Sequence, residues 1–209
     1  MQIEKNKSKI FENNKNQSSN FKEHFKDFLS FALETIKAIV ISLVIIIPIR
    51  YFLIQPFYVK GASMEPTFNN HDYLIVNEIE YRFSSPKRGD IIVFRYPGDK
   101  REYFIKRIIG LPNERVKIEN NKVFIYNNKF PKGVEINEKY LNEKDIKKNA
   151  DTTLNGNEYF VLGDNRNNSF DSRFFGTVSK DLIIGKVWLR GWPFNNVKIF
   201  KEEMYNLPK

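Results

Sequence analysis

Ser63 has neighbours that suit a nucleophile. It lies in the segment Gly-Ala-Ser-Met-Glu-Pro-Thr, residues 61–67. A nucleophilic serine needs a tight turn with small neighbours, so that its hydroxyl and backbone N–H both face a substrate carbonyl. Gly61 and Ala62 supply the small neighbours, and Pro66 stiffens the exit from the turn. The same composition is typical of an ordinary turn, so Ser63 by itself is only a candidate.

Lys106 is a candidate general base because it stands inside an apolar run. Residues 103–110 read Tyr-Phe-Ile-Lys-Arg-Ile-Ile-Gly, and strand alternation places Phe104, Lys106 and Ile108 on one face and Arg107 on the other. Burial between large apolar side chains disfavours the ammonium and lowers the pKa of the amine. A base active near neutral pH needs a pKa roughly 2–3 below the usual value of about 10.4. Alternatively, either basic residue extends into solvent from an edge strand.

A polar loop that follows Leu162 is the third candidate. Residues 163–173 read Gly-Asp-Asn-Arg-Asn-Asn-Ser-Phe-Asp-Ser-Arg. Such side chains hydrogen-bond one another and their own backbone through Asx turns, which is usually a structural role. An ordered set of eleven residues is nevertheless far more specific than a dipeptide.

Short strands must position these candidates. Runs of β-branched and aromatic residues alternate with Gly, Pro, Asn and Asp, and no convincing amphipathic helix intervenes. We therefore predict a mostly β, antiparallel domain over residues 57–209, with a small inserted β subdomain at about 113–157. Residues 114–128 read as a hairpin that turns at 119–121, and the polar residues 129–157 read as a surface excursion. The predicted strands are 73–76, 91–94, 103–109, 116–126, 159–162 and 182–189.

An uncharged stretch before Ser63 predicts one transmembrane helix. Residues 38–49 carry no charge and the apolar character resumes after Arg50, so we place the anchor at 38–56, near the short end of what spans a bilayer. Lys37 and Arg50 would reach opposite interfaces. A cleaved signal peptide or a buried core helix is the alternative, but a signal peptide normally begins nearer the N-terminus and ends in a small-x-small site, which is missing here.

Composition limits the remaining possibilities. Residues 1–37 read as a tail and interfacial segment; the first 27 residues carry six Lys and four acidic side chains, which places the tail in the cytoplasm and the β-domain outside by the positive-inside rule. The net charge of +9 suits anionic lipid and nucleic acid equally well. The absence of Cys excludes thiol catalysis, cysteine zinc clusters and disulfides, and no metal or nucleotide motif occurs. We expect no cofactor and no metal site.

The anchor and the three candidates, in this order, resemble the bacterial type I signal peptidase family. The resemblance covers the chain apart from its tail. It implies that Ser63 is the nucleophile and Lys106 the general base of a membrane-bound serine endopeptidase that cleaves signal peptides from exported preproteins. It also implies that Ser169 hydrogen-bonds and orients the Lys106 amine, and that Asp171 and Arg173 form a supporting ion pair beneath the site.

The resemblance further implies how substrate is recognised. Phe57, Val59 and Ile105 would line shallow pockets for small side chains at positions −1 and −3 of the signal peptide, because a larger side chain would clash with apolar walls. Phe57 and Val59 have an alternative role as interfacial anchors. The implied partners are preproteins and the phospholipid membrane, with no nucleic acid, and the implied location is the bacterial cell (inner) membrane.

Two positions depart from the family pattern. Some members have a Ser two places before the nucleophile whose hydroxyl helps to bind the oxyanion, where this chain has Gly61. The oxyanion hole must then depend on the Ser63 N–H with another N–H or a water, and Gly61 is expected to let that donor approach. The family often follows its Lys strand with Gly-Leu-Pro-Gly-Asp, where this chain has Asn113 and Glu114. Asn tolerates the left-handed conformation, so we expect the same turn.

Three other functions share parts of this pattern. A self-cleaving repressor of the LexA type has a β fold and a Ser/Lys pair, but it requires an N-terminal DNA-binding helix-turn-helix, where this chain has a tail and an apolar stretch. A non-enzymatic, membrane-tethered β-domain that binds anionic lipid or nucleic acid would require the three candidates to coincide by accident. A Ser-His-Asp hydrolase is poorly supported because His71 is the only His after residue 24, and it lies in a turn-like Asn-His-Asp.

Overall fold

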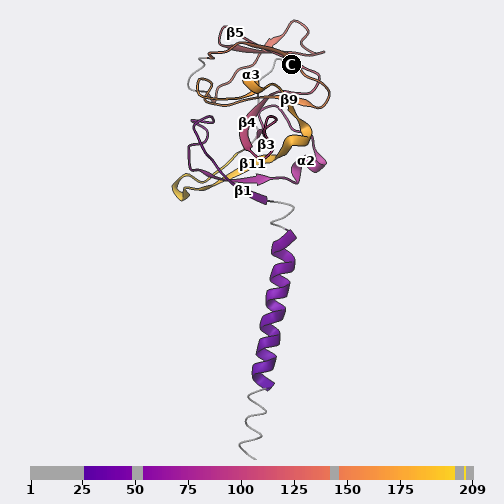
Figure 1. Ribbon diagram of the computed structural model, residues 1–209, viewed down its shortest axis with the longest axis vertical. Helices are drawn as coiled ribbons and strands as arrows, with labels where there is room; N and C mark the ends of the chain where they lie inside the picture. The colour runs from indigo at the N-terminus through magenta and orange to yellow at the C-terminus, as the bar shows by residue number, and fades with distance from the viewer. Residues whose placement is uncertain (1–25, 49–53, 142–145, 201–204, 206–209) are drawn as a thin grey trace, which may run out of the picture. The chain divides into compact units, whose positions relative to one another are not determined.

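The chain folds as an N-terminal helix and a separate β-domain (Figure 1). The computed structural model describes residues 26–48, 54–141, 146–200 and 205. Arg50 and the aromatic residues directly after it lie outside the described residues. The helix and the β-domain are therefore described separately.

The helix Lys26–Pro48 is long and apolar enough to cross a membrane, by length and composition. The hydroxyls of its polar residues Thr35 and Ser42 donate to the carbonyl oxygens of Phe31 and Ala38 at 2.8 and 2.9 Å. A polar group without a partner is costly in hydrocarbon. These internal hydrogen bonds make both hydroxyls compatible with a bilayer.

The helix does not follow the predicted anchor limits of 38–56. The described helix already includes Lys26, and apolar residues such as Phe28 and Phe31 extend its apolar surface on the N-terminal side of residue 38. Residues 54–56 were wrongly included, since they belong to β1 (Ile54–Tyr58), which pairs antiparallel with β2 (Tyr73–Asn77). Backbone pairing with β2 therefore decides the conformation of residues 54–56.

The β-domain contains two antiparallel sheets, which confirms the predicted mostly β fold. The larger sheet has the order β1-β2-β11-β3-β4-β9-β10 with β12 beside β11, and the smaller has the order β7-β6-β5-β8. Two short helices, α2 and α3, have four residues each. The remaining elements are β3 (Ile91–Arg95), β4 (Tyr103–Gly110), β5 (Arg115–Glu119), β6 (Lys122–Tyr126), β7 (Val134–Glu135), β8 (Ala150–Thr153), β9 (Glu158–Leu162), β10 (Val178–Ser179), β11 (Ile183–Trp192), β12 (Lys198–Ile199), α2 (Glu80–Phe83), α3 (Ser172–Phe175), η1 (Lys180–Leu182) and η2 (Phe194–Asn196).

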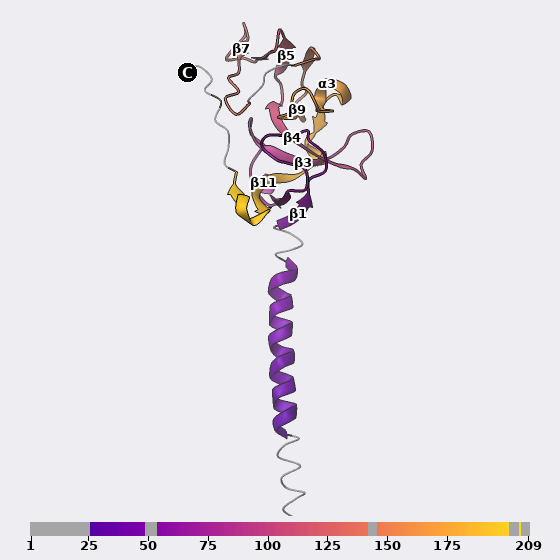
Figure 2. The same cartoon turned by 90° about the vertical axis from the view of Figure 1, so that its left-hand side faces the viewer.

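The hairpin predicted at residues 114–128 is formed by β5 and β6. Asn120 and Asn121 turn the chain with φ of 50° and 62°, a left-handed conformation in which Asn is enriched. Asn113 has φ of 65°, so the expected turn after the Lys106 strand is also present. Figures 1 and 2 both show β5 at the end of the domain away from β1.

Residues 129–157 are not the surface excursion that their polar composition predicted. They contain β7 and β8, and three of their aliphatic residues, Ile136, Ile146 and Leu154, are buried in the core that the smaller sheet shares with β4 and β9. Widely spaced among Lys and Asn, these aliphatics leave no periodic pattern in the sequence. The segment completes the smaller sheet.

β4 is the strand that positions the candidate site. It lies between β3 and β9, with Lys106 opposite Ile92 and Arg107 opposite Leu162. Lys106 is 4% exposed and Arg107 is 2% exposed. The alternative in which these residues extend into solvent from an edge strand is therefore wrong.

Candidate active site

Ser63 lies in the connection between β1 and β2, which is anchored to the core. The N–H of Val59 donates to the carbonyl oxygen of Asp72, and the N–H of His71 donates to that of Val59, each at 2.9 Å. Met64, directly after the serine, is buried. The turn predicted around Ser63 is therefore held in place on both sides.

Gly61 has a backbone conformation that explains its identity. Its φ is +91°, which glycine adopts without steric cost. Its N–H donates to Asn70 Oδ1 at 2.9 Å, so this N–H is not available for an oxyanion. A Cβ at Gly61 would meet no atom within 4 Å, so the space is open and no described protein donor fills it.

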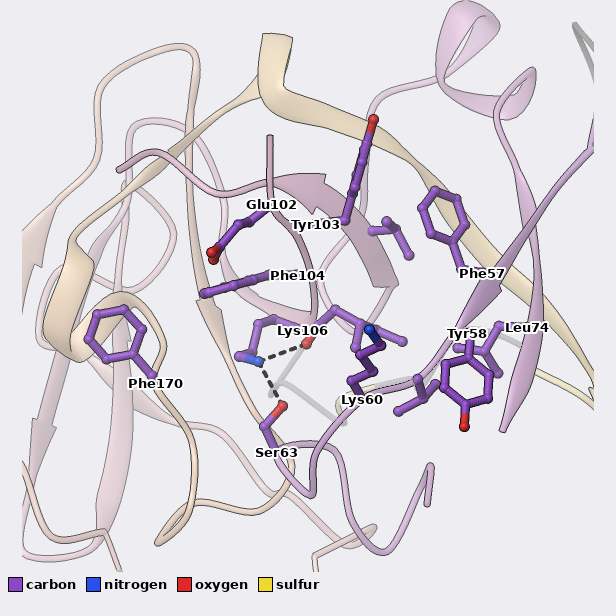
Figure 3. Close-up of a pocket in the computed structure, with 13 residues that line it drawn as sticks. Phe57, Tyr58, Lys60, Ser63, Leu74, Glu102, Tyr103, Phe104, Lys106 and Phe170 are labelled. Carbon is purple, nitrogen blue, oxygen red and sulfur yellow. Dashed lines mark hydrogen bonds between the residues drawn. The ribbon is translucent and has the colours of Figure 1, made fainter. Parts of the chain in front are cut away.

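Lys106 and Ser63 are in direct hydrogen-bond contact (Figure 3). Lys106 Nζ donates to Ser63 Oγ at 2.8 Å and to the Ile105 carbonyl oxygen at 2.9 Å. Both acceptors are neutral, and Lys106 takes part in none of the ion pairs among the described residues. Burial lowers the pKa of Lys106 to about 8, although Asp171 and Asp164 act in the opposite direction. Lys106 thus has the environment that the sequence predicted for a base.

The polar loop 163–173 is bonded directly to the Ser63 segment. The Asn165 N–H donates to the Ser63 carbonyl oxygen, and its side-chain amide donates to the Ala62 carbonyl oxygen, each at 3.1 Å. A Cβ on Gly163 would lie 2.4 Å from the Ser63 carbonyl oxygen and 2.2 Å from Ser169 Oγ. This close approach of loop and nucleophile segment requires glycine at position 163.

Asp171 and Arg173 form the ion pair that the resemblance implied. Arg173 Nε and Nη2 donate to Asp171 Oδ1 and Oδ2 at 2.8 and 2.7 Å. Asp171 Oδ2 also accepts from the Gly163 N–H at 3.1 Å, and Arg173 donates to the Arg166 carbonyl oxygen at 2.8 Å. Both charges are buried and compensated, so the pair closes the loop on itself.

Ser169 does not make the hydrogen bond to Lys106 that the resemblance implied. Its Oγ is buried and has no hydrogen-bond partner within the described part of the chain. The Lys106 amine is bonded instead to Ser63 and to the carbonyl of Ile105, its neighbour on the same strand. The expectation for Ser169 is corrected accordingly: in this structure a backbone carbonyl orients the amine.

Arg107 is a structural residue of the site that the sequence did not reveal. Its guanidinium donates to Asp164 Oδ1 and Oδ2 at 2.8 and 2.6 Å. Asp164 Oδ2 also accepts from Thr67 Oγ1 at 2.6 Å. These contacts join β4, the polar loop and the Ser63 segment. Strand alternation places Arg107 only on the face opposite Lys106, and no local pattern predicts that this face is also buried or that Asp164 lies against it.

A pocket of about 650 Å³ opens beside the Ser63–Lys106 pair. Figure 3 shows Phe57 on one side of this pair and Phe170 on the other. Phe57, Val59 and Ile105, the three predicted substrate-binding residues, all line the pocket. The full lining is Phe57, Tyr58, Val59, Lys60, Ser63, Leu74, Val93, Glu102, Tyr103, Phe104, Ile105, Lys106 and Phe170.

The described part of the chain offers no group of three or more His, Cys, Asp or Glu side chains that could hold a metal ion. His71 stacks on Tyr58 with ring centres 5.5 Å apart and shares a 3.1 Å hydrogen bond with the Asn70 amide. It belongs to the turn that the sequence predicted. Its contacts are those of a structural residue.

Comparisons with known proteins identify the family of this chain. Residues 32–192 match the family described as signal peptidase, peptidase S26. The chain is 34% identical over 177 residues to probable signal peptidase I-2 of Synechocystis sp., with 82% of this chain and 78% of that protein covered. It is 39% identical over 173 residues to signal peptidase I of Leptolyngbya laminosa, with 79% and 82% covered. A crystal structure of signal peptidase I from Enterococcus faecalis is 33% identical, covers 49% of this chain and 97% of that chain, and gives a TM-score of 0.42. With a family match over most of its length and relatives above 30% identity, this chain belongs to the signal peptidase family, peptidase S26, serine endopeptidases that cleave signal peptides by a Ser/Lys mechanism.

Proposed function

We propose that Ser63 is the nucleophile and Lys106 the general base with which this signal peptidase cleaves preproteins. The observation that carries the proposal is the 2.8 Å contact between Lys106 Nζ and Ser63 Oγ. A serine hydroxyl needs an adjacent base to become an effective nucleophile. Burial lowers the pKa of Lys106 to about 8, so the neutral amine that can accept the hydroxyl proton is accessible near neutral pH.

The proposed reaction has two steps. In the first, neutral Lys106 accepts the Oγ proton while Oγ attacks the scissile carbonyl carbon, and the resulting ammonium gives the proton to the leaving amine. The amine departs as the N-terminus of the mature protein, and the signal peptide remains as an ester on Ser63. In the second, Lys106 takes a proton from a water that attacks this ester, and the proton returns to Ser63 Oγ as the signal peptide leaves.

The oxyanion of both tetrahedral intermediates is assigned to the Ser63 backbone N–H. The Gly61 N–H is held by Asn70, and the space beside Gly61 is open. A water in that space would be the second donor. Removing one such donor from other enzymes raises the barrier by about 2.7–4 kcal/mol, so loss of this water is expected to slow the reaction.

Asp171 and Arg173 are assigned a supporting role. Their ion pair fixes the loop that carries Asn165, and Asn165 holds the Ser63 segment through two hydrogen bonds of 3.1 Å. Loss of the ion pair would loosen Asn165 and displace Ser63 from Lys106. Small displacements of this kind reduce rates strongly, because attack requires near-contact geometry.

Phe57, Val59 and Ile105 are proposed to form the pockets for the small side chains at positions −1 and −3. Val59 is buried in a hydrophobic cluster, and Phe57 and Ile105 pack against the same cluster. Walls that belong to a close-packed core do not yield easily to a larger side chain. Selection of small residues then follows from steric exclusion.

The helix Lys26–Pro48 is proposed to anchor the enzyme in the phospholipid bilayer of the bacterial cell membrane. The six Lys against four acidic residues in the first 27 favour a cytoplasmic N-terminus, with residues 57–209 on the outer side. The chain has no Cys, so a single Cys introduced at the exposed position Lys129 can be labelled specifically. A membrane-impermeant maleimide should label it in intact cells; labelling only after lysis would reverse the proposed orientation.

The assignment of Ser63 is tested by incubating the detergent-solubilised full chain with a preprotein and mapping the products by mass spectrometry. We expect one cut, with small residues at positions −1 and −3, and no cut by Ser63→Ala. The variant should unfold at the same temperature as the parent, because it loses one hydroxyl. Full cleavage by Ser63→Ala would contradict the assignment.

A further inference from the structure

An aromatic shelf lies beside the Ser63–Lys106 pair; it consists of Tyr96, Phe104, Phe170, Phe174 and Phe175. Its ring centres are 4.7 Å apart for Tyr96 and Phe104, 6.5 Å for Phe104 and Phe170, and 5.5 Å for Phe170 and Phe175. The rings come from three segments: the residue directly after β3, the strand β4, and the polar loop with α3. None of these contacts has a role in the proposed reaction.

Phe170 is the shelf residue best placed to meet a substrate. It is 49% exposed, although it contacts other rings of the shelf. Phe170 and Phe104 also line the pocket that contains Ser63 and Lys106. A peptide bound at Ser63 is therefore in the same cavity as this exposed ring, and covering the ring would remove apolar surface from water.

The shelf lies on the opposite side of the catalytic pair from the proposed signal-peptide pockets. Along β4, Tyr103 contacts Phe57 with ring centres 5.5 Å apart, and Ile105 packs in the cluster that contains Phe57. Phe104 lies between them in the sequence but belongs to the shelf, where its ring stacks on that of Tyr96. Figure 3 shows the same division, with Phe57 and Phe170 on opposite sides of the pair.

The spacing fits the start of the mature protein. The Phe104 ring centre is 5.5 Å from Lys106 Nζ, and the ring centres of Phe104 and Phe170 are 6.5 Å apart. An extended peptide advances about 3.3 Å per residue. If residues before the scissile bond occupy the Phe57 side, the first residues after the bond reach the shelf.

We propose that the aromatic shelf binds an apolar side chain at position +1 or +2 of the preprotein, with Phe170 as the specificity-determining residue. The proposal rests on the proposed function, because the scissile bond must lie at Ser63. Glu102 lines the same pocket and is exposed; Figure 3 shows its carboxylate on the Phe104 side. This carboxylate disfavours acidic residues at the same positions.

The test uses the full-length enzyme in detergent and preproteins that differ only at positions +1 and +2, with Phe, Ala or Asp at each. We expect kcat/KM to fall in the order Phe, Ala, Asp at one of these positions. Phe170→Ala should lower kcat/KM for the Phe substrate by roughly 2–10-fold, the range of one aromatic contact, and leave the Ala substrate nearly unchanged. Phe170→Leu should retain part of the preference, and Glu102→Gln should improve the Asp substrate.

Phe83→Ala is the matched control, because Phe83 is 85% exposed and is not among the residues that line the pocket. It should leave all substrates unchanged. Equal loss by Phe170→Ala on every substrate, or a changed preference at −1 or −3, would overturn the shelf assignment. In either case Ser63→Ala still decides separately whether Ser63 is the nucleophile.

Discussion

Lys106 and Arg107 are adjacent on β4 and almost equally buried, yet their surroundings are opposite. The Lys106 amine meets a hydroxyl and a carbonyl oxygen at 2.8 and 2.9 Å. The Arg107 guanidinium meets both oxygens of Asp164 at 2.8 and 2.6 Å. One strand therefore presents a basic side chain with only neutral hydrogen-bond partners on one face and an ion-paired one on the other.

The electrostatic consequences differ in sign. Burial lowers the pKa of Lys106 to about 8, and the carboxylates of Asp171 and Asp164 offset this only in part. Burial acts on Arg107 in the same direction, but the adjacent Asp164 outweighs it and raises the pKa of Arg107 above its ordinary value. Lysine can lose its proton in such a place, whereas arginine stays charged and suits bidentate pairing. The face of β4 that carries Lys106 is therefore suited to proton transfer, whereas the face that carries Arg107 is suited to stabilising the fold.

The largest expected effect comes from replacing Lys106 by a cation that cannot act as a base. Lys106→Arg keeps the positive charge but stays protonated at any accessible pH. We expect cleavage of a preprotein to fall about 10³–10⁴-fold, measured as kcat/KM. Lys129→Arg, at an exposed position of the same domain, is the control and should be fully active. Activity of Lys106→Arg within a few-fold of the parent would remove Lys106 from the mechanism.

Arg107→Met should instead destabilise the fold. It leaves Asp164 buried with Thr67 as a remaining donor, and breaking one side of a buried pair typically costs about 3–5 kcal/mol. Chemical unfolding of the full chain in detergent measures the loss. The double variant Arg107→Met with Asp164→Leu should recover part of it, because no unpaired charge remains. An Arg107→Met enzyme as stable as the parent would show that the ion pair of Arg107 with Asp164 does not stabilise the fold.

Lys106→Met should change stability in the opposite direction. A pKa lowered from 10.5 to about 8 corresponds to roughly 3 kcal/mol against the folded state. Between these values the unfolded chain binds more protons than the folded one, so this cost is complete below about pH 8 and disappears as the pH approaches 10.5. Unfolding at neutral and alkaline pH should show a gain from Lys106→Met of up to about 3 kcal/mol at pH 7 and little above pH 10. A gain in stability that does not depend on pH would show that better packing, and not removal of the buried charge, stabilises the variant.

The smallest effect is expected at an exposed ion pair of similar geometry. Arg115 donates to both oxygens of Asp151 at 2.7 and 2.6 Å on the smaller sheet, but both side chains are more than 40% exposed. Exposed pairs contribute about 0–1 kcal/mol. Arg115→Met should therefore change the unfolding free energy far less than Arg107→Met does. A loss comparable to that of Arg107→Met would show that burial does not determine how much an ion pair contributes to stability.

The sequence predicted the parts of the site whose signal is local. Strand alternation identified Lys106 as an inward residue, and the turn residues around Ser63 and at Asn120 and Asn121 have the conformations expected of them. The pairing of Arg107 with Asp164 spans 57 positions, and no local pattern reports such a contact. The prediction of a surface excursion at residues 129–157 was wrong for a related reason. Isolated aliphatic residues such as Ile136 form a core only when strands far apart in the sequence pack together.

The hydrogen bond expected of Ser169 could not be predicted for a different reason. The place of this residue in the loop was predicted correctly, but the hydrogen bond expected of it depends on where the Lys106 amine points. That direction is set by the Ile105 carbonyl oxygen at 2.9 Å, a backbone group that sequence patterns do not place. Residue types in a motif indicate the chemistry, whereas the partners of each atom are decided by packing.

The pH dependence of cleavage tests the central claim most directly. If neutral Lys106 is the base, kcat/KM should rise about tenfold per pH unit at low pH and level off above about 8. The same substrate and enzyme should be followed from about pH 6 to about pH 10, with folding monitored by circular dichroism at each pH. A midpoint near 8 is the predicted result; a profile that is flat over this range, or that rises only near the ordinary lysine value of 10.5, would contradict the account.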